Sequence, residues 1–397
     1  MNLEMHILQN FVPSNLNRDD TGTPKDCVFG GVRRARVSSQ CVKRSIRLHP
    51  SFSRKIEEAG GDVGKRTKLI RDEIAKLLIA NGTDQNTGKA AAAGIVHLLG
   101  LKFEKPKGEN TPAKTQYLLY LGQNEVRELA DLASRTEVLN AASDAFGQHG
   151  ETWDKVAETI GKSKDLGDVA KQVKSVVNNS RLGSRAYAAD IALFGRMVAD
   201  DKDMNVDAAC QVAHAISTNR ADIDIDFYTA VDDFNVEDAG AGMMGTSEFT
   251  SSCFYRYMNL DLDKLGENLA HNRDLMAATV CGFVEAAVKA IPSGKQNSSA
   301  AQNPPCYVRT IIRDDGFPWS LAGAFSKPVQ SNGSRSLEEE SADRLEEHFG
   351  SMRSAYGADG IQFDELVSTL SGRAGVSLSQ HLANLDGFVS RNLQGQE

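Results

Sequence analysis

The chain lacks most of the short motifs that mark metalloproteins, enzymes and membrane proteins. Its six cysteines are scattered, and none has the partners or spacing of a zinc site. No run approaches about 18 apolar residues, so no transmembrane helix is expected. The start lacks the pattern of a signal peptide, and Walker A, nucleophile-elbow and dinucleotide-binding motifs are absent. We therefore expect reduced thiols, a cytoplasmic location and no resident metal or cofactor.

Positive charge is also scarce, except in one segment. The 397 residues carry 53 acidic and 45 basic side chains and a net charge of −8, which argues against a protein that coats DNA indiscriminately. Residues 22–47 reverse this balance, because their only acid is Asp26 and their seven basic residues are Lys25, Arg33, Arg34, Arg36, Lys43, Arg44 and Arg47. Such segregation predicts a localised strip that binds a polyanion.

The pattern of this region predicts a strand, a loop, a second strand and a helix. Alternating apolar residues predict a half-buried strand over residues 2–11 and a short strand over 32–37, separated by a long loop at 12–31. Ser38 is a typical helix N-cap, and a helix is expected over residues 39–48.

The first turn of that helix is the candidate anion site. Free backbone N–H groups and the helix dipole attract anions there, and Lys43 and Arg47 share one helix face. The alternative is a solvated charged face. The candidate contacts to an RNA backbone are Arg18, Lys25, Arg34, Arg36, Ser38, Ser39, Gln40, Lys43, Arg44 and Arg47.

Helical and strand patterns alternate along the rest of the chain. We expect a helical insertion over 52–180 with a short strand near 117–121, followed by a buried strand or helix at 186–197 and an amphipathic helix at 205–217. A long hairpin is expected over 217–260 and a helix at 266–290. A loop at 292–305, a strand at 306–312 and a helical part over 337–397 are expected to follow. In the hairpin, the alternation at residues 222–227 predicts that the isoleucines point inward and that Phe227 packs in a core.

The hairpin and a later loop carry further candidate contacts. Tyr228 and Thr229 end one strand and offer a stacking surface. Met243 and Met244 lie near a Gly-rich tip, where methionine packs adaptably against bases or another subunit. Lys295 lies in a Gly/Ser loop that can contact a phosphate.

The acidic strand of the hairpin has the spacing of a calcium loop without its other requirements. Asp222, Asp224 and Asp226 match the opening positions, but Phe227 stands where glycine is needed and Asp233 stands in place of a bidentate glutamate. A solvated acidic face is the favoured interpretation, and no metal site is predicted.

Taken together and in this order, a set of motifs resembles the CasC-type backbone subunits of type I-E CRISPR Cascade complexes. The motifs are Asn17-Arg18-Asp19-Asp20, Lys25-Asp26, Phe29-Gly30-Gly31, Arg33-Arg34-x-Arg36-x-Ser38-Ser39-Gln40-x-x-Lys43-Arg44, Ala213-His214-Ala215-Ile216, Asp224-Ile225-Asp226, Thr229-Ala230-Val231-Asp232-Asp233, Phe254-Tyr255-Arg256-Tyr257, and Gly294-Lys295-Gln296 with Asn303-Pro304. The matching blocks lie in residues 1–47, 185–260 and 290–325.

The resemblance implies an α+β right-hand fold. It has an RRM-like (ferredoxin-like) palm, a helical finger insertion and a β-hairpin thumb. The implied boundaries are palm at 1–50, finger at 51–184, palm at 185–216, thumb at 217–252, palm at 253–330 and a C-terminal helical part at 331–397.

The resemblance also implies a non-catalytic RNA-binding function. Copies of the chain would polymerise head-to-tail along guide CRISPR RNA, with other Cascade subunits, and present the RNA in segments for pairing with target DNA; no membrane is involved. Family phosphate contacts would fall on Arg18, Lys25, Ser38, Gln40, Lys43 and Arg44, contacts to the kinked backbone or displaced base on Met197, Tyr228 and Thr229, and candidate DNA contacts on Lys102, Lys105 and Lys107.

The competing hypothesis is a metal-dependent ribonuclease, because related CRISPR backbone subunits cut RNA with an acidic residue near the thumb. The candidate metal ligands would be Asp222, Asp224, Asp226, Asp232 and Asp233.

Overall fold

The computed structural model describes residues 1–105, 112–178, 185–198, 201–231, 233–234, 243–331 and 333–392. The chain divides into two compact units. The sheet unit contains Met1–Lys55, Cys210–Asp263 and the chain from Ala277 onward, and the helical unit contains Ile56–Ala209 and Lys264–Met276. Residues 185–209, predicted as palm, thus group with the helical unit.

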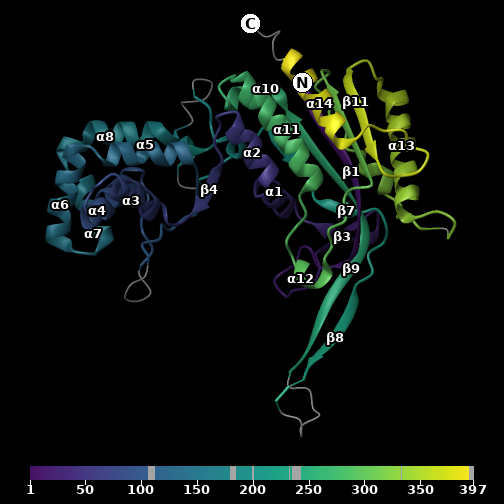
Figure 1. Ribbon diagram of the computed structural model, residues 1–397, viewed down its shortest axis with the longest axis horizontal. Helices are drawn as coiled ribbons and strands as arrows, with labels where there is room; N and C mark the ends of the chain where they lie inside the picture. Colours follow the sequence, from purple (N-terminus) through teal and green to yellow (C-terminus); the bar gives the residue numbers. More distant parts are fainter. Residues whose placement is uncertain are drawn as a thin grey trace. The chain divides into compact units, whose positions relative to one another are not determined.

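A nine-stranded sheet organises the described part of the sheet unit (Figure 1). Its main path is β11-β10-β1-β9-β7-β3-β2, and β6 and β8 also pair with β9. The strands are β1 (Asn2–Ser14), β2 (Asp26–Phe29), β3 (Val32–Val37), β6 (Cys210–Val212), β7 (Ala215–Ser217), β8 (Asp224–Ala230), β9 (Met243–Asp261), β10 (Tyr307–Arg313) and β11 (Ile361–Ser368). The helices of this part are α1 (Ser39–Arg47), α2 (Pro50–Glu58), α10 (Leu262–Asn268), α11 (Arg273–Lys289), α12 (Gln296–Ser299), α13 (Leu337–Tyr356), α14 (Leu378–Asn392) and the 3-10 turn η4 (Leu321–Phe325); α2, α10 and α11 contain residues of both units.

Four strands and two helices follow the order of a ferredoxin-like fold. Along the chain they run β1, α1, β7, β9, α11, β10, and within the sheet the strands lie in the order β10-β1-β9-β7. The last strand therefore pairs with the first, and the first pairs with the third, as in an RRM-like palm. The predicted α+β class is confirmed.

Helical layers cover both faces of this sheet. On one face, the Arg256 guanidinium donates to the Ala287 carbonyl of α11 at 2.7 Å. On the other, α13 and η4 contribute Leu345 and Phe325 to a buried cluster with Tyr255 of β9. Strand β1 is therefore buried on both sides, and the half-buried strand expected there was wrong in this respect.

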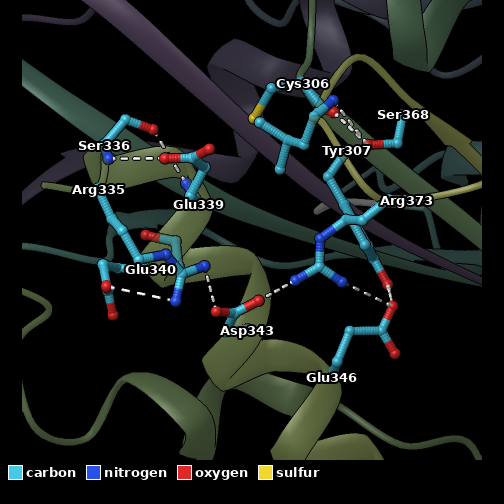
Figure 2. Close-up of polar contacts among 12 residues, drawn as sticks. Cys306, Tyr307, Arg335, Ser336, Glu339, Glu340, Asp343, Glu346, Ser368 and Arg373 are labelled. Carbon is cyan, nitrogen blue, oxygen red and sulfur yellow. Dashed lines mark hydrogen bonds and ion pairs between the residues drawn. The ribbon is translucent and has the colours of Figure 1, made fainter.

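The α13 layer is fixed by internal ion pairs and hydrogen bonds (Figure 2). Ser336 and Glu339 form a capping box at the start of the helix, which satisfies free N–H groups of its first turn. Arg373 pairs with Asp343 of the helix, and Tyr307 of β10 donates to Glu346 at 2.6 Å. These charged side chains of α13 are therefore engaged in contacts that hold the helix against the rest of the sheet unit.

The helical unit is an Ala/Leu-rich bundle with a small ribbon. Its buried cluster is built mainly from side chains of the helices α3 to α8. The elements are β4 (Gly64–Thr67), α3 (Ile70–Ala80), α4 (Gln85–Leu98), β5 (Leu119–Gly122), α5 (Gln123–Ala133), α6 (Thr136–His149), α7 (Trp153–Gly161), η1 (Lys164–Leu166), α8 (Gly167–Val177), α9 (Ala189–Phe194) and η3 (Lys202–Met204). The predicted strand near residues 117–121 is β5, whose partner β4 was not predicted.

Four expectations about local structure were wrong, and in two of them, at 205–217 and in the C-terminal part, pairing with a distant strand overrode the local pattern. The amphipathic helix expected at 205–217 is instead the short strands β6 and β7, which both pair with β9. The loop expected at 12–31 contains β2, and the C-terminal helical part contains β11. The expected helix at 266–290 is interrupted between α10 and α11, where Ala270 and His271 have positive φ angles.

The structure bears on two expectations drawn from the sequence, the reduced thiols and the absence of a transmembrane helix. All six cysteines have free thiols. Among the described residues, no helix combines the length and apolar character needed to cross a bilayer.

Candidate nucleic-acid interface

The first turn of α1 is built as the sequence predicts. Ser38 is the N-cap, and its hydroxyl accepts the Cys41 N–H at 3.3 Å, while Val42 and Ile46 of the helix are buried. The Ser38 N–H donates to Asn17 Oδ1 at 2.8 Å, which ties the helix start to the preceding loop. Ser38 is therefore buried, and its hydroxyl serves the cap.

Ser39 and Gln40 differ in what they offer at this turn. The Ser39 hydroxyl donates to the Val212 carbonyl at 2.7 Å, and its N–H donates to the His214 ring at 3.1 Å. Gln40 is exposed. Segments far apart in sequence, α1 and the β6–β7 turn, are thereby brought together at the predicted anion site.

Six cations remain as a candidate surface, and we call them the basic strip. Arg18 and Arg44 are exposed, while Lys25, Arg36, Lys43 and Arg47 are half-buried. Among the described residues, no carboxylate lies within ion-pair distance of Arg18, Lys25 or Arg44. The members of the strip are Arg18, Lys25, Arg36, Lys43, Arg44 and Arg47.

A cavity of about 540 Å³ opens beside α1 in the sheet unit. Arg18 and Arg44 both line it, together with Asp19 and Gly294. A hydrogen bond from the Thr21 hydroxyl is the main cause that lowers the pKa of Asp19, and two backbone N–H groups also bind this carboxylate. The Asp19 carboxylate is thus hydrogen-bonded within its own turn by Thr21 and Thr23. Arg18 and Arg44 are the two cations that line the cavity.

Arg33 and Arg34 do not belong to the strip, although the charge count included both. Arg33 pairs with Asp26. Arg34 has no exposed surface, and its guanidinium donates to the carbonyls of Ser217, Thr218 and Phe325 at 2.7–3.0 Å. The prediction that Arg34 contacts RNA was wrong, because its strand position faces β7 and η4 and is covered by them.

Lys295 lies near the root of the β8–β9 hairpin. It is exposed and has a positive φ angle of 51°. The preceding Gly294 is required, because a Cβ there would lie 2.4 Å from the Leu16 carbonyl oxygen. Lys295 and Tyr228 line one cavity of about 430 Å³, so the structure brings these two candidates together.

The hairpin itself is exposed on both faces. Ile225 and Phe227 are 70% and 62% exposed, so the expectation that they point into a core was wrong. Thr229 pairs with Met244, Ala230 pairs with Met243, and both methionines are exposed. A two-stranded arm has no second layer, so its apolar side chains remain available to RNA or to another protein.

The other candidates lie in the helical unit or outside the described residues. Met197 is 86% exposed and lines a cavity of about 540 Å³ with Arg66 and Tyr120. Lys102 and Lys105 are exposed. Lys107, Asp232 and much of the hairpin tip lie outside the described residues.

His214 was not among the contacts predicted from the sequence. The structure places its ring between Ser39 and Arg36. Only the signal of its motif, Ala213-His214-Ala215-Ile216, pointed to this position.

Comparison with known proteins identifies the family of this chain. The family model described as CT1975-like protein matches residues 3–389. The chain belongs to the CT1975-like family. A search of curated proteins gave no match.

Chains of solved structures are also similar to this CT1975-like chain over nearly its whole length. One similar chain comes from a structure titled "CRISPR RNA-guided surveillance complex, pre-nicking", with 30% identity, a TM-score of 0.78, and coverage of 98% of this chain and 100% of that one. Another comes from a "CRISPR RNA-guided surveillance complex", with 26% identity, a TM-score of 0.71 and the same coverage.

The burial of Arg34 predicts a structural role. Replacing Arg34 by Met should lower the free energy of unfolding by about 2–4 kcal/mol, because three buried carbonyls lose their donor. Urea denaturation measures this change. The matched control is Arg33→Met on the exposed neighbour, expected to change stability by less than about 0.5 kcal/mol. Equal effects of the two substitutions would contradict the assignment.

Proposed function

We propose that this chain is a backbone subunit of a CRISPR RNA-guided surveillance complex, that it binds guide RNA through the basic strip, and that it works in the cytoplasm. The CT1975-like family and the surveillance-complex structures support the type of assembly. The observation that carries RNA binding is local: Arg18, Lys25 and Arg44 lie beside α1 without carboxylate partners among the described residues, in a chain of net charge −8.

The chemistry of the strip suits a sugar-phosphate backbone. Each phosphate neutralised on a single strand releases about 0.7 counterion, so contact with four phosphates gives a salt slope near −3. One copy would bind RNA modestly and release it at high salt. Several copies on one strand would hold it firmly, because each added contact is effectively intramolecular.

The finer assignment to a type I-E Cascade complex rests on the motif set of residues 1–47, 185–260 and 290–325. In that arrangement, head-to-tail contacts that do not close would give a filament along the guide. Tyr228, Thr229, Met243 and Met244 of the exposed hairpin would contact RNA or the next copy, and Met197 and Lys295 would add contacts to the RNA. The palm, finger and thumb boundaries and the pairing of guide with target DNA belong to the same proposal.

We also propose that the chain is not an enzyme. Asp224 and Asp226 lie on the exposed strand β8, and Asp222 pairs with Arg220 at 3.4 Å. Within the ranges that the structure describes, no three His, Cys, Asp or Glu side chains are grouped so as to hold a metal ion.

Removing two cations of the strip should weaken RNA binding. The double variant Lys43→Ala with Arg44→Ala is expected to lower the magnitude of the salt slope by about 1.4 and to lose co-purified RNA. Fluorescence anisotropy with single-stranded RNA at several salt concentrations measures the slope.

A matched control removes the same charge elsewhere. Lys162→Ala with Lys171→Ala removes two exposed lysines of the helical unit that pair with neighbouring acids, and RNA binding should be unchanged. If the Lys43 and Arg44 variant retained RNA as well as wild type at about 0.3 M salt, the proposed function would be wrong.

The non-catalytic proposal has its own test. The purified assembly is incubated with labelled complementary RNA and Mg²⁺, and the RNA is expected to stay intact on a sequencing gel. Regularly spaced cuts that disappear in Asp226→Ala or Asp232→Ala would establish the ribonuclease instead.

A further inference from the structure

His214 meets the basic strip from the turn between β6 and β7. Its Nδ1 accepts the backbone N–H of Ser39 at 3.1 Å and lies 3.3 Å from a guanidinium nitrogen of Arg36. The residue is open to solvent on one side, and these contacts cover part of its ring. The imidazole therefore accepts the hydrogen bond from the Ser39 N–H, the donor that an anion at the start of α1 would use.

The two contacts determine the protonation of this ring. Ser39 N–H and the Arg36 guanidinium are both donors, so Nδ1 must carry a lone pair and the proton of the neutral ring lies on Nε2. Burial lowers the pKa of His214, and the positive charges of Arg36 and Lys25 lower it further. The nearby carboxylate of Asp26 is engaged by Arg33. Without RNA, the ring is held neutral among cations.

We propose that His214 is a further RNA ligand of the strip and binds a backbone phosphate as the imidazolium ion, an inference that rests on the proposed function. An arriving phosphate oxygen accepts the Ser39 N–H in place of Nδ1. The released ring takes one proton from solvent at Nδ1 and donates it as a hydrogen bond to the phosphate. Arg36 and Lys25 stay beside the same phosphate.

This exchange links RNA binding to proton uptake. Phosphate raises the pKa of His214, whereas the free site lowers it, so the complex holds more protons than the free chain between the two values. RNA affinity should therefore rise as pH falls through that window, by at most tenfold per pH unit for one group. The added cation should also steepen the salt slope by about 0.7.

The test measures RNA affinity of the full-length chain from pH 8 to pH 5.5. The probe is an oligouridylate of about 12 nucleotides, close to one binding site, with a rhodamine label, because neither uracil nor the dye titrates in this range. Wild type should bind more tightly at low pH. His214→Asn keeps an oxygen that can accept the Ser39 N–H but cannot take up a proton, so its affinity should not rise as the pH falls.

His149→Gln is the matched control. His149 ends α6 of the helical unit, which contains no member of the basic strip, and its Nε2 lies 2.9 Å from the Thr159 hydroxyl. This variant should keep the pH response of wild type. A flat wild-type profile, or an unchanged response in His214→Asn, would overturn the role of His214.

A second measurement does not depend on a variant. The pKa of His214, read from its ring proton NMR signals, should rise by about one unit or more when the oligouridylate binds, equivalent to a tenfold linkage. No rise would contradict the inference. Failure of the proposed function looks different, because wild type would then show no salt-dependent RNA binding even at pH 8.

Discussion

The interface depends on the buried guanidinium of Arg34, which fixes the strand that leads into α1. Its donors satisfy the carbonyls of Ser217, Thr218 and Phe325, so β3, the end of β7 and η4 are held by one side chain. Because β3 ends at the Ser38 cap, this anchor sets where the first turn of α1 lies relative to the β6–β7 turn. Arg34 therefore positions the basic strip by its hydrogen bonds and is not itself a member of it.

The α1 region shows how far sequence reasoning reaches. The strand, the Ser38 cap and the helix could be predicted, because each depends on residues close together in the chain. The burial of Arg34 could not be predicted, because Arg34 and Arg36 share one strand face by spacing. Contacts with the end of β7 and with η4, which are distant in sequence, bury Arg34 and leave Arg36 partly exposed. The position of His214 beside Ser39 is also a product of tertiary pairing, and the chain pattern carries only its motif.

In the β8–β9 hairpin, the sequence pattern predicted the strand but not its exposure. Its alternation at residues 222–227 correctly predicted a strand, but the same alternation suggested burial of Ile225 and Phe227, which are exposed. Alternation reports that two faces differ in polarity, and it does not report whether a second layer exists. An exposed apolar arm on a CT1975-like chain is consistent with a surface that is completed only in an assembly.

The central claim is that the start of α1 is where this chain holds RNA. Photo-crosslinking of the RNA-bound chain with 4-thiouridine RNA, followed by mass spectrometry of the linked peptides, tests this most directly. The account predicts that crosslinks concentrate in peptides covering residues 17–47 and the Lys295 loop. Crosslinks concentrated in α13 and β11, with none in residues 17–47, would contradict it.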